Sequence, residues 1–194
     1  MENLINPKDK VRQGAGFPLT GPGLVHIYCG DGKGKTTCGM GLCCRAAGFG
    51  YKVLICQFMK DNSSSERKAL SSLGNVTFVD GPEKEKFSFL MTQEEKAERR
   101  SYYNERLRMV AQKAVREKTD VLFLDEVLYA IDAGLMDESL LVKFLDSRPG
   151  SMEVILTGRN PGRELTDRAD YISEIRKIKH PYDHDQPARN GIEK

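Results

Sequence analysis

The chain has no tryptophan, and it has no apolar run approaching the roughly 20 residues needed to cross a bilayer. Its first residues, MENLINPKDK, lack the apolar core of a signal peptide. A net charge of +2 provides neither the basic surface of a nucleic-acid-binding protein nor an acidic tail. The sequence therefore predicts a soluble, cytoplasmic protein that binds neither membranes nor nucleic acid.

Cysteines are present, but their spacing argues against a metal or disulfide framework. None of the 5 cysteines belongs to a CxxC pair. They lie in predicted strands or in a glycine-rich predicted helix, so we interpret them as small apolar core residues in a reducing compartment. These residues are Cys29, Cys38, Cys43, Cys44 and Cys56.

Length and proline content indicate the domain organisation. At 194 residues the chain suits one domain and is too short for two ordinary domains with separate cores. Residues 1–23 are polar and interrupted by prolines, which predicts a flexible N-terminal arm. Residues 24–194 are predicted to form a single nucleotide-binding domain.

A glycine-rich loop, GDGKGKTT at residues 30–37, follows an apolar run. Its glycines let the backbone come close to a ligand, and its N–H groups can face an anion at the start of the next helix. Lys35 would reach the outer phosphates of a nucleotide, and the Thr36 hydroxyl would help to hold Mg²⁺. The spacing departs from the usual P-loop, because Gly30 and Gly34 enclose three residues and the usual loop encloses four.

An acid pair ends a second apolar run, VLFLDEV at residues 121–127. A buried strand that delivers a carboxylate beside the phosphate loop is typical of Mg–nucleotide sites. Adjacent strand residues point to opposite faces, so Asp125 and Glu126 should play different parts unless the strand has already turned. Either carboxylate can be the one on the metal side.

Strand-like runs alternate with helix-like segments along the chain. Strands are expected at 24–29, 53–58, 76–79, 121–127, 153–159 and 171–175, and helices at 35–47, 93–118, 137–147 and after Asn160–Pro161. Thr92 and Glu95 form a capping-box signature at the start of the longest helix. This alternation predicts an α/β fold, a P-loop NTPase-like three-layer sandwich with a mainly parallel central sheet.

Several side chains have two interpretations. Arg45 either covers apolar surface with its stem or turns toward a nucleotide, and Arg159 is either a surface ion-pair residue or a phosphate-side cation. The segment that carries Phe87 and Phe89 either packs beneath its loop or presents an apolar surface to a partner. His26 is interpreted as a hydrogen-bonded strand histidine.

Taken together, the motifs resemble those of the P-loop ATP:corrinoid adenosyltransferases. They are the shortened loop GDGKGKTT, then RAAGFG, QFMK, LDEV, RPG, TGRNP, AD at 169–170, KHP at 179–181 and GIE near the end. They occur in order from about residue 24 onward, and the three-residue spacing of the loop is the spacing of this family.

The resemblance implies that a reduced corrinoid, with cobalt as Co(I), attacks the 5′ carbon of ATP and that triphosphate leaves. It implies an ATP site at Gly30, Asp31, Gly32, Lys33, Gly34, Lys35, Thr36, Thr37 and Arg45, with Lys35 and Arg159 neutralising the triphosphate. It implies Mg²⁺ or Mn²⁺ beside Thr36, Asp125 and Glu126. Phe87 and Phe89 lie where the family has a Phe-x-Trp pair over the corrin face, and here they would exclude the lower axial ligand of cobalt.

The family also suggests a homodimer and a reducing flavoprotein or other electron donor. The arm before residue 24 lacks the amphipathic helix that can cover the corrinoid in relatives. Two other classes stay open on the residues alone. One is a P-loop ATPase or kinase of another type, and the other is a non-catalytic module that senses nucleotide or corrinoid.

Overall fold

The computed structural model describes residues 21–193 except 84, 85 and 87. Most of the predicted arm, and Phe87, therefore lie outside the described residues. In the described part, six strands form one sheet in the order β3-β2-β4-β5-β1-β6, and every pairing is parallel. The strands are β1 (Val25–Cys29), β2 (Val53–Gln57), β3 (Val76–Val79), β4 (Val121–Asp125), β5 (Glu153–Thr157) and β6 (Tyr171–Glu174).

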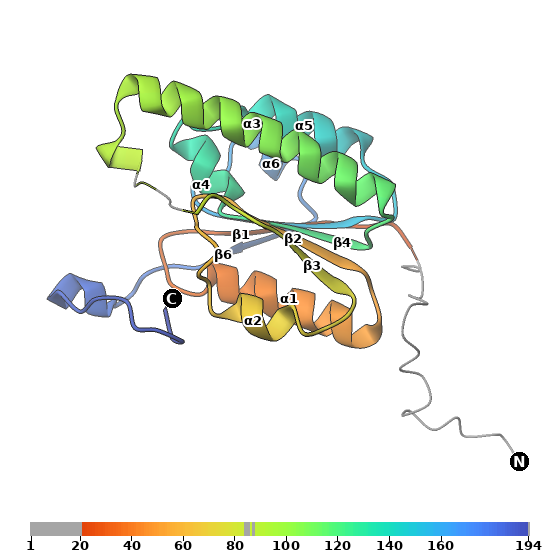
Figure 1. The fold of residues 1–194 in the computed structure, drawn as a ribbon, viewed down its shortest axis with the longest axis horizontal. Helices are drawn as coiled ribbons and strands as arrows, with labels where there is room; N and C mark the ends of the chain where they lie inside the picture. The colour runs from red at the N-terminus through yellow and green to blue at the C-terminus, as the bar shows by residue number, and fades with distance from the viewer. Residues whose placement is uncertain (1–20, 84–85, 87, 194) are drawn as a thin grey trace, which may run out of the picture.

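Helices cover both faces of this sheet, as Figure 1 shows. On one face lie α1 (Lys35–Phe49) and α2 (Glu66–Leu70), and on the other lie α3 (Gln93–Arg116), α4 (Val127–Asp132), α5 (Glu138–Ser147) and α6 (Arg163–Thr166). Two short 3₁₀ turns, η2 (Ser88–Leu90) and η3 (Pro181–His184), complete the elements. The predicted three-layer α/β architecture with a parallel central sheet is confirmed.

The sheet separates two hydrophobic cores. The larger lies under α3, α4 and α5 and contains Leu122 and Leu124, and the smaller lies under α1 and contains Phe123. Burial of β4 on both faces explains its uninterrupted apolar run. In α1, a Cβ atom on Gly39 would lie 2.3 Å from the Phe123 ring, so glycine lets this helix pack tightly on the sheet.

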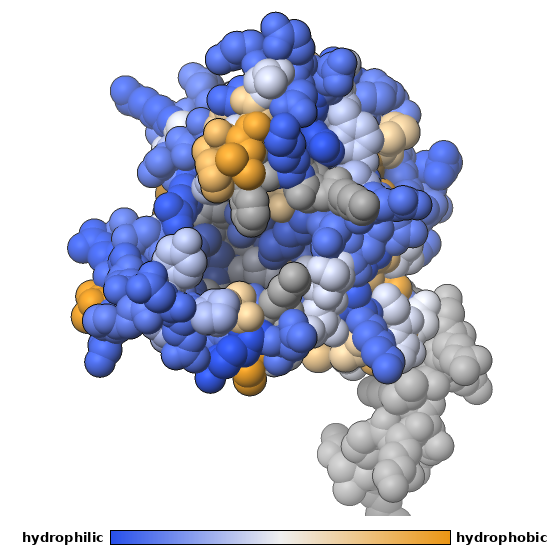
Figure 2. All heavy atoms as spheres, turned by 60° about the vertical axis from the view of Figure 1, so that its left-hand side comes forward, coloured by the Kyte–Doolittle hydropathy of each residue, from blue (hydrophilic) through white to orange (hydrophobic). Residues whose placement is uncertain are grey.

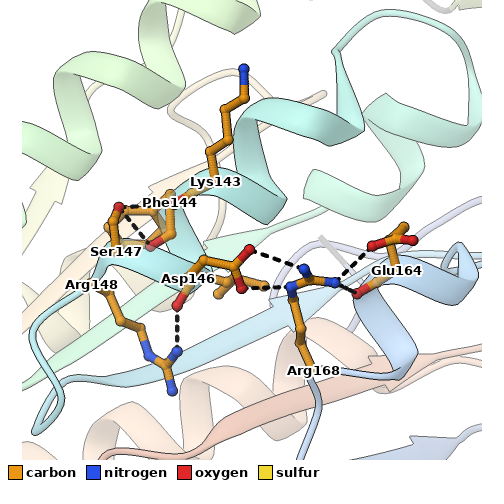
Figure 3. Close-up of polar contacts among 8 residues, drawn as sticks. Lys143, Phe144, Asp146, Ser147, Arg148, Glu164 and Arg168 are labelled. Carbon is orange, nitrogen blue, oxygen red and sulfur yellow. Dashed lines mark hydrogen bonds and ion pairs between the residues drawn. The ribbon is translucent and has the colours of Figure 1, made fainter.

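The predicted capping box of α3 is confirmed. The Glu95 N–H donates to Thr92 Oγ1 at 3.2 Å, and the Thr92 N–H donates to the Glu95 carboxylate at 2.7 Å. In the same helical layer, Arg168 connects α5 to α6 (Figure 3). Its guanidinium donates to both Asp146 carboxylate oxygens and to Glu164. These contacts fix element ends on the face that carries α3.

Some local predictions are wrong. The strand expected at 121–127 ends at Asp125, and α2 lies between the strands expected at 53–58 and 76–79, where no helix was expected. Asn160 does not cap α6, because that helix begins at Arg163 and takes Gly162 as its N-cap, and the Asn160 amide donates to Asp132.

The cysteine prediction is partly wrong, since Cys38 and Cys44 are exposed on α1 while Cys29, Cys43 and Cys56 are buried. His26 is confirmed as a hydrogen-bonded strand residue, with Nε2 lying 2.5 Å from Glu153 Oε1. Within the described residues, no helix combines the length and the apolar composition that a bilayer crossing requires.

Candidate nucleotide site

The carboxyl ends of β1, β2, β4 and β5 meet at one edge of the sheet. The parallel register places Gln57 opposite Asp125 and Tyr28 opposite Thr157. In open α/β sheets this edge is where ligands bind. The sequence-predicted loop and acid pair are both found here.

The glycine-rich loop, residues 30–37, connects β1 to α1 with left-handed backbone at Gly30 (φ 110°) and Gly34 (φ 119°). A Cβ atom on Gly30 would lie 2.4 Å from the Ile175 carbonyl oxygen, and the Gly32 N–H donates to that oxygen at 2.8 Å. The loop is therefore held by the chain that leaves β6. Lys35 begins α1, so the open N–H groups of its first turn face the loop.

Asp125, at the end of β4, is completely buried and accepts four hydrogen bonds. Its Oδ1 accepts from the hydroxyls of Thr36 (2.9 Å) and Thr157 (2.7 Å). Its Oδ2 accepts from the Gln57 amide (3.0 Å) and the Lys60 ammonium (2.8 Å). The carboxylate thus ties α1 to the ends of β2, β4 and β5.

Glu126 lies just past the strand end, with φ 60° and ψ 14°. Its backbone N–H donates to Thr157 Oγ1 at 2.8 Å, which fixes the turn into α4. The chain has therefore turned before Glu126, and the alternation expected within a strand does not apply. Burial raises the pKa of Glu126 and the charge of Asp125 raises it further, while nearby cations led by Lys60 oppose the shift.

The oxygen donors at this edge fit a hard divalent cation. The Thr36 hydroxyl and the Asp125 carboxylate are in contact, and Glu126 follows directly in the chain. Among the described residues, no group of three or more histidine, cysteine, aspartate or glutamate side chains is arranged around a metal position. Hydroxyl and carboxylate oxygens are donors of the kind that Mg²⁺ takes together with waters and phosphate.

A cavity of about 650 Å³ opens at this edge. Its walls are residues 32–37 of the glycine-rich loop, the segment 59–66 after β2 (except Asn62), Lys86, Glu126 and residues 191–193. A second hollow of about 270 Å³ shares part of the loop and adds Asp31, Arg159 and residues from the C-terminal segment. Both spaces are of a size to hold parts of a small-molecule ligand.

Most of the sequence-predicted site residues come together here, but Arg45 does not. Arg45 is exposed on α1 and lines neither space. The Asp31 carboxylate accepts the Lys177 N–H at 2.8 Å, which lowers the pKa of Asp31. The Lys35 ammonium turns back to the Gly32 carbonyl at 2.8 Å, and burial lowers its pKa.

Sequence reasoning missed three side chains that build the site, namely Gln57, Lys60 and Thr157. Each stands at or just beyond the carboxyl end of a buried strand, at the edge that the fold makes the ligand edge. Polarity at those positions was the signal that could have identified them.

Hydrophobic side chains gather on the face that Figure 2 turns forward, above a hollow in the surface. In η2 the residues Phe89 and Leu90 are 75% and 58% exposed. Packing of Phe89 beneath its loop, one of the two sequence interpretations, is therefore wrong. Phe87, its predicted partner, lies outside the described residues.

Residues 22–193 match the model of the family described as ATP:corrinoid adenosyltransferase BtuR/CobO/CobP. A corrinoid adenosyltransferase of Escherichia coli (strain K12) is 30% identical over 171 residues, covering 88% of this chain and 85% of the relative. One from a Sinorhizobium species is 30% identical over 179 residues, covering 88% and 80%. One from Pseudomonas aeruginosa is 26% identical over 176 residues, covering 88% and 83%.

Proposed function

The chain belongs to the ATP:corrinoid adenosyltransferase family, and from this premise we propose that the cavity beside the glycine-rich loop binds ATP for transfer of its 5′-deoxyadenosyl group to a reduced corrinoid. The activity is ATP-dependent adenosylation of corrinoids, in cobalamin synthesis or salvage. We also propose that residues 24–194 are one nucleotide-binding domain and residues 1–23 a flexible arm.

One observation supports this proposal most directly. The glycine-rich loop and Glu126 line a cavity of about 650 Å³, and the Thr36 hydroxyl of that loop donates to the buried Asp125 carboxylate at 2.9 Å. A loop of inward N–H groups at the start of a helix favours phosphate, and oxygen donors beside it favour a hard cation. We interpret the loop as a P-loop for the triphosphate.

The proposed step is a single displacement. The electron pair of Co(I) forms a Co–C bond to the 5′ carbon of ATP, the C–O bond to the triphosphate breaks, and its electron pair leaves on the triphosphate oxygen. The corrinoid itself is the nucleophile, so the protein needs no activated serine, cysteine or lysine. Its contribution is to position the reactants and to neutralise the leaving group.

We propose a role for each of these side chains. Lys35 and Arg159 would neutralise charge on the triphosphate, with the N–H groups of residues 30–37 as further donors. Asp31, in the second hollow, and Arg45 would lie on the nucleoside side. Because Arg45 is exposed outside both spaces, its proposed role needs either a side-chain rearrangement or a nucleoside that extends beyond them.

Thr36, Asp125 and Glu126 would hold Mg²⁺ or Mn²⁺. The ion, when bound, supplies positive charge that stabilises the departing triphosphate. Asp125 is held by its protein partners, so Glu126 is the more available of the two carboxylates to a ligand in the cavity.

The corrinoid would lie against the exposed apolar surface of η2. We propose that Phe87 and Phe89 cover the lower face of the corrin and exclude the axial ligand, which makes Co(II) easier to reduce. A homodimer, a reducing flavoprotein or other electron donor, and a cytoplasmic location are further predictions of the same proposal.

The test is incubation of the protein with ATP, Mg²⁺ and chemically reduced cob(I)alamin. We expect triphosphate and a light-sensitive Co–C product. Release of ADP and phosphate without that product would identify a P-loop ATPase or kinase of another type. Binding of both substrates without turnover would identify a sensing module.

A further inference from the structure

Lys60 occupies an unusual position just after β2. Its ammonium donates to Thr36 Oγ1 at 2.9 Å and to Asp125 Oδ2 at 2.8 Å. These two oxygens belong to the proposed metal-binding side chains. The Lys60 side chain is 27% exposed, and it also lines the 650 Å³ cavity.

Among the four donors to Asp125, Lys60 is the charged one. The other three are the neutral side chains of Thr36, Gln57 and Thr157, which the helix and strand ends hold in place. A completely buried carboxylate without a compensating charge is costly, so the ammonium stabilises Asp125. A divalent cation bound to the same two oxygens would supply that compensation instead, and like charges this close repel each other.

The backbone that carries Lys60 is anchored, while its side chain is long and flexible. The preceding residue, Met59, has φ 53°, and its N–H donates to the Tyr103 hydroxyl at 3.0 Å. Tyr103 is completely buried, so the chain that carries Lys60 is anchored to α3. Beyond that anchor, four rotatable methylene groups connect the backbone to the ammonium.

We propose that the Lys60 ammonium occupies the metal position in the nucleotide-free protein. When nucleotide binds, the ammonium leaves Thr36 and Asp125 and pairs with the triphosphate, and the divalent cation takes its place beside those two side chains. This inference rests on the proposed function, because it requires the triphosphate to lie against the glycine-rich loop. The exchange keeps Asp125 paired with a cation throughout. It also makes metal binding depend on nucleotide, and it adds a second lysine to Lys35 at the leaving group.

The experiment uses two probes on the full chain and its Lys60→Met variant. Free Mn²⁺ is titrated without nucleotide and followed by electron paramagnetic resonance, and Mg²⁺–tripolyphosphate binding is measured by calorimetry. In Lys60→Met, Mn²⁺ should bind at least about tenfold tighter, because the competing ammonium is gone. Tripolyphosphate should bind about tenfold more weakly, because one cation at the phosphates is lost.

Two further variants serve as controls. Lys60→Arg keeps the charge, so its Mn²⁺ affinity should stay close to that of the wild type. Lys52→Met removes a lysine at the opposite end of β2, where the ammonium contacts the Glu117 carbonyl at 2.7 Å, and should change neither affinity. Opposite shifts for the two probes cannot come from a general loss of folding, which would weaken both.

Unchanged or weaker Mn²⁺ binding by a folded Lys60→Met variant would overturn the inference. So would tripolyphosphate binding equal to that of the wild type. If the wild type itself fails to bind Mg²⁺–tripolyphosphate, the proposed function fails. If the wild type binds it and Lys60→Met shows neither shift, only the role of Lys60 fails.

Discussion

At the scale of single residues, kinetic measurements can distinguish the two interpretations of Arg159, a surface ion-pair residue or a cation beside the triphosphate. It is exposed just after β5 and lines the hollow that shares Lys33 and Lys35 with the main cavity. If it neutralises the leaving triphosphate, Arg159→Met should lower kcat for adenosyl transfer by about 10²-fold and change KM for ATP less, because the charge develops in the transition state.

Arg163→Met is the matched control for Arg159. Arg163 is an exposed arginine four residues further on, paired with Asp167 on α6. Its loss should leave the rate unchanged. Equal rates for both variants would show that Arg159 is an ordinary surface residue.

Glu153 makes folding stability depend on pH. It lies 2.5 Å from His26 Nε2 and accepts the Leu24 N–H at 2.8 Å. Burial acts to raise its pKa, but these contacts outweigh burial and hold the pKa below the ordinary 4.5. A depressed carboxyl pKa stabilises the fold above pH 4.5, and that contribution is lost as pH falls through the lower folded value.

Glu153→Gln should therefore lower the free energy of unfolding near neutral pH by about 1 kcal/mol, after allowance for partial exposure. The difference from the wild type should shrink as pH falls below 4.5. Urea denaturation at neutral and acidic pH measures both values. A difference that does not vary with pH would contradict an ionic contribution from this carboxyl.

At the scale of elements, α1 begins within the glycine-rich loop, at Lys35, and packs closely on the sheet at Gly39. Gly39→Ala would place a methyl group 2.3 Å from the ring of the fully buried Phe123, which has no room to move. The variant should lose about 1–3 kcal/mol of stability. Thermal unfolding is the measurement.

Gly41 provides the comparison within the same helix. A Cβ atom there meets no heavy atom within 4 Å, so Gly41→Ala should stabilise the protein by about 0.5–1 kcal/mol through helix propensity. If both variants shift the melting temperature in the same direction, packing of α1 on β4 does not explain Gly39.

The predictability of the elements depended on how far local sequence determined them. Long apolar runs such as 121–124 predicted strands, and the Thr92–Glu95 box predicted the start of α3 correctly. The short helices α2 and α4 were missed because a turn or two of helix shows no periodicity. Asn160 misled because its backbone is left-handed (φ 45°) and α6 begins later, after Gly162.

At the scale of the whole molecule, adenosyl transfer has to bring an apolar surface and a phosphate site together. η2 presents Phe89 and Leu90 to solvent, and Lys86 of the same segment lines the main cavity. Phe89→Ala should therefore impair reduction of bound Co(II) corrinoid while ATP binding stays unchanged.

Electronic spectra of Co(II)alamin with the protein and ATP measure the first effect, and ATP calorimetry measures the second. We expect the variant to lose the spectral signs of four-coordinate cobalt. Val115→Ala, which removes an exposed apolar side chain near the end of α3, is the control and should alter neither. Spectra equal to those of the wild type would rule out Phe89 as a cover for the corrin face.

The convergence of groups at the candidate site was predictable where one stretch of sequence carries them, as in residues 30–37 and the pair Asp125–Glu126. It was not predictable where distant strands contribute single polar groups. Thr157 bonds both the Asp125 carboxylate and the Glu126 N–H, and only the parallel register of β4 and β5 brings it there.

The path of the chain after β6 has a practical consequence. Residues 191–193 form part of the cavity wall, so any group attached directly after them would start at the rim of the site. The Gly23 N–H donates to the Gly150 carbonyl just before β1 and β5, at the opposite edge of the sheet from the cavity (Figure 1). Changes to residues 191–193 are therefore changes to the site itself, whereas changes at Gly23 lie at the opposite ends of the strands.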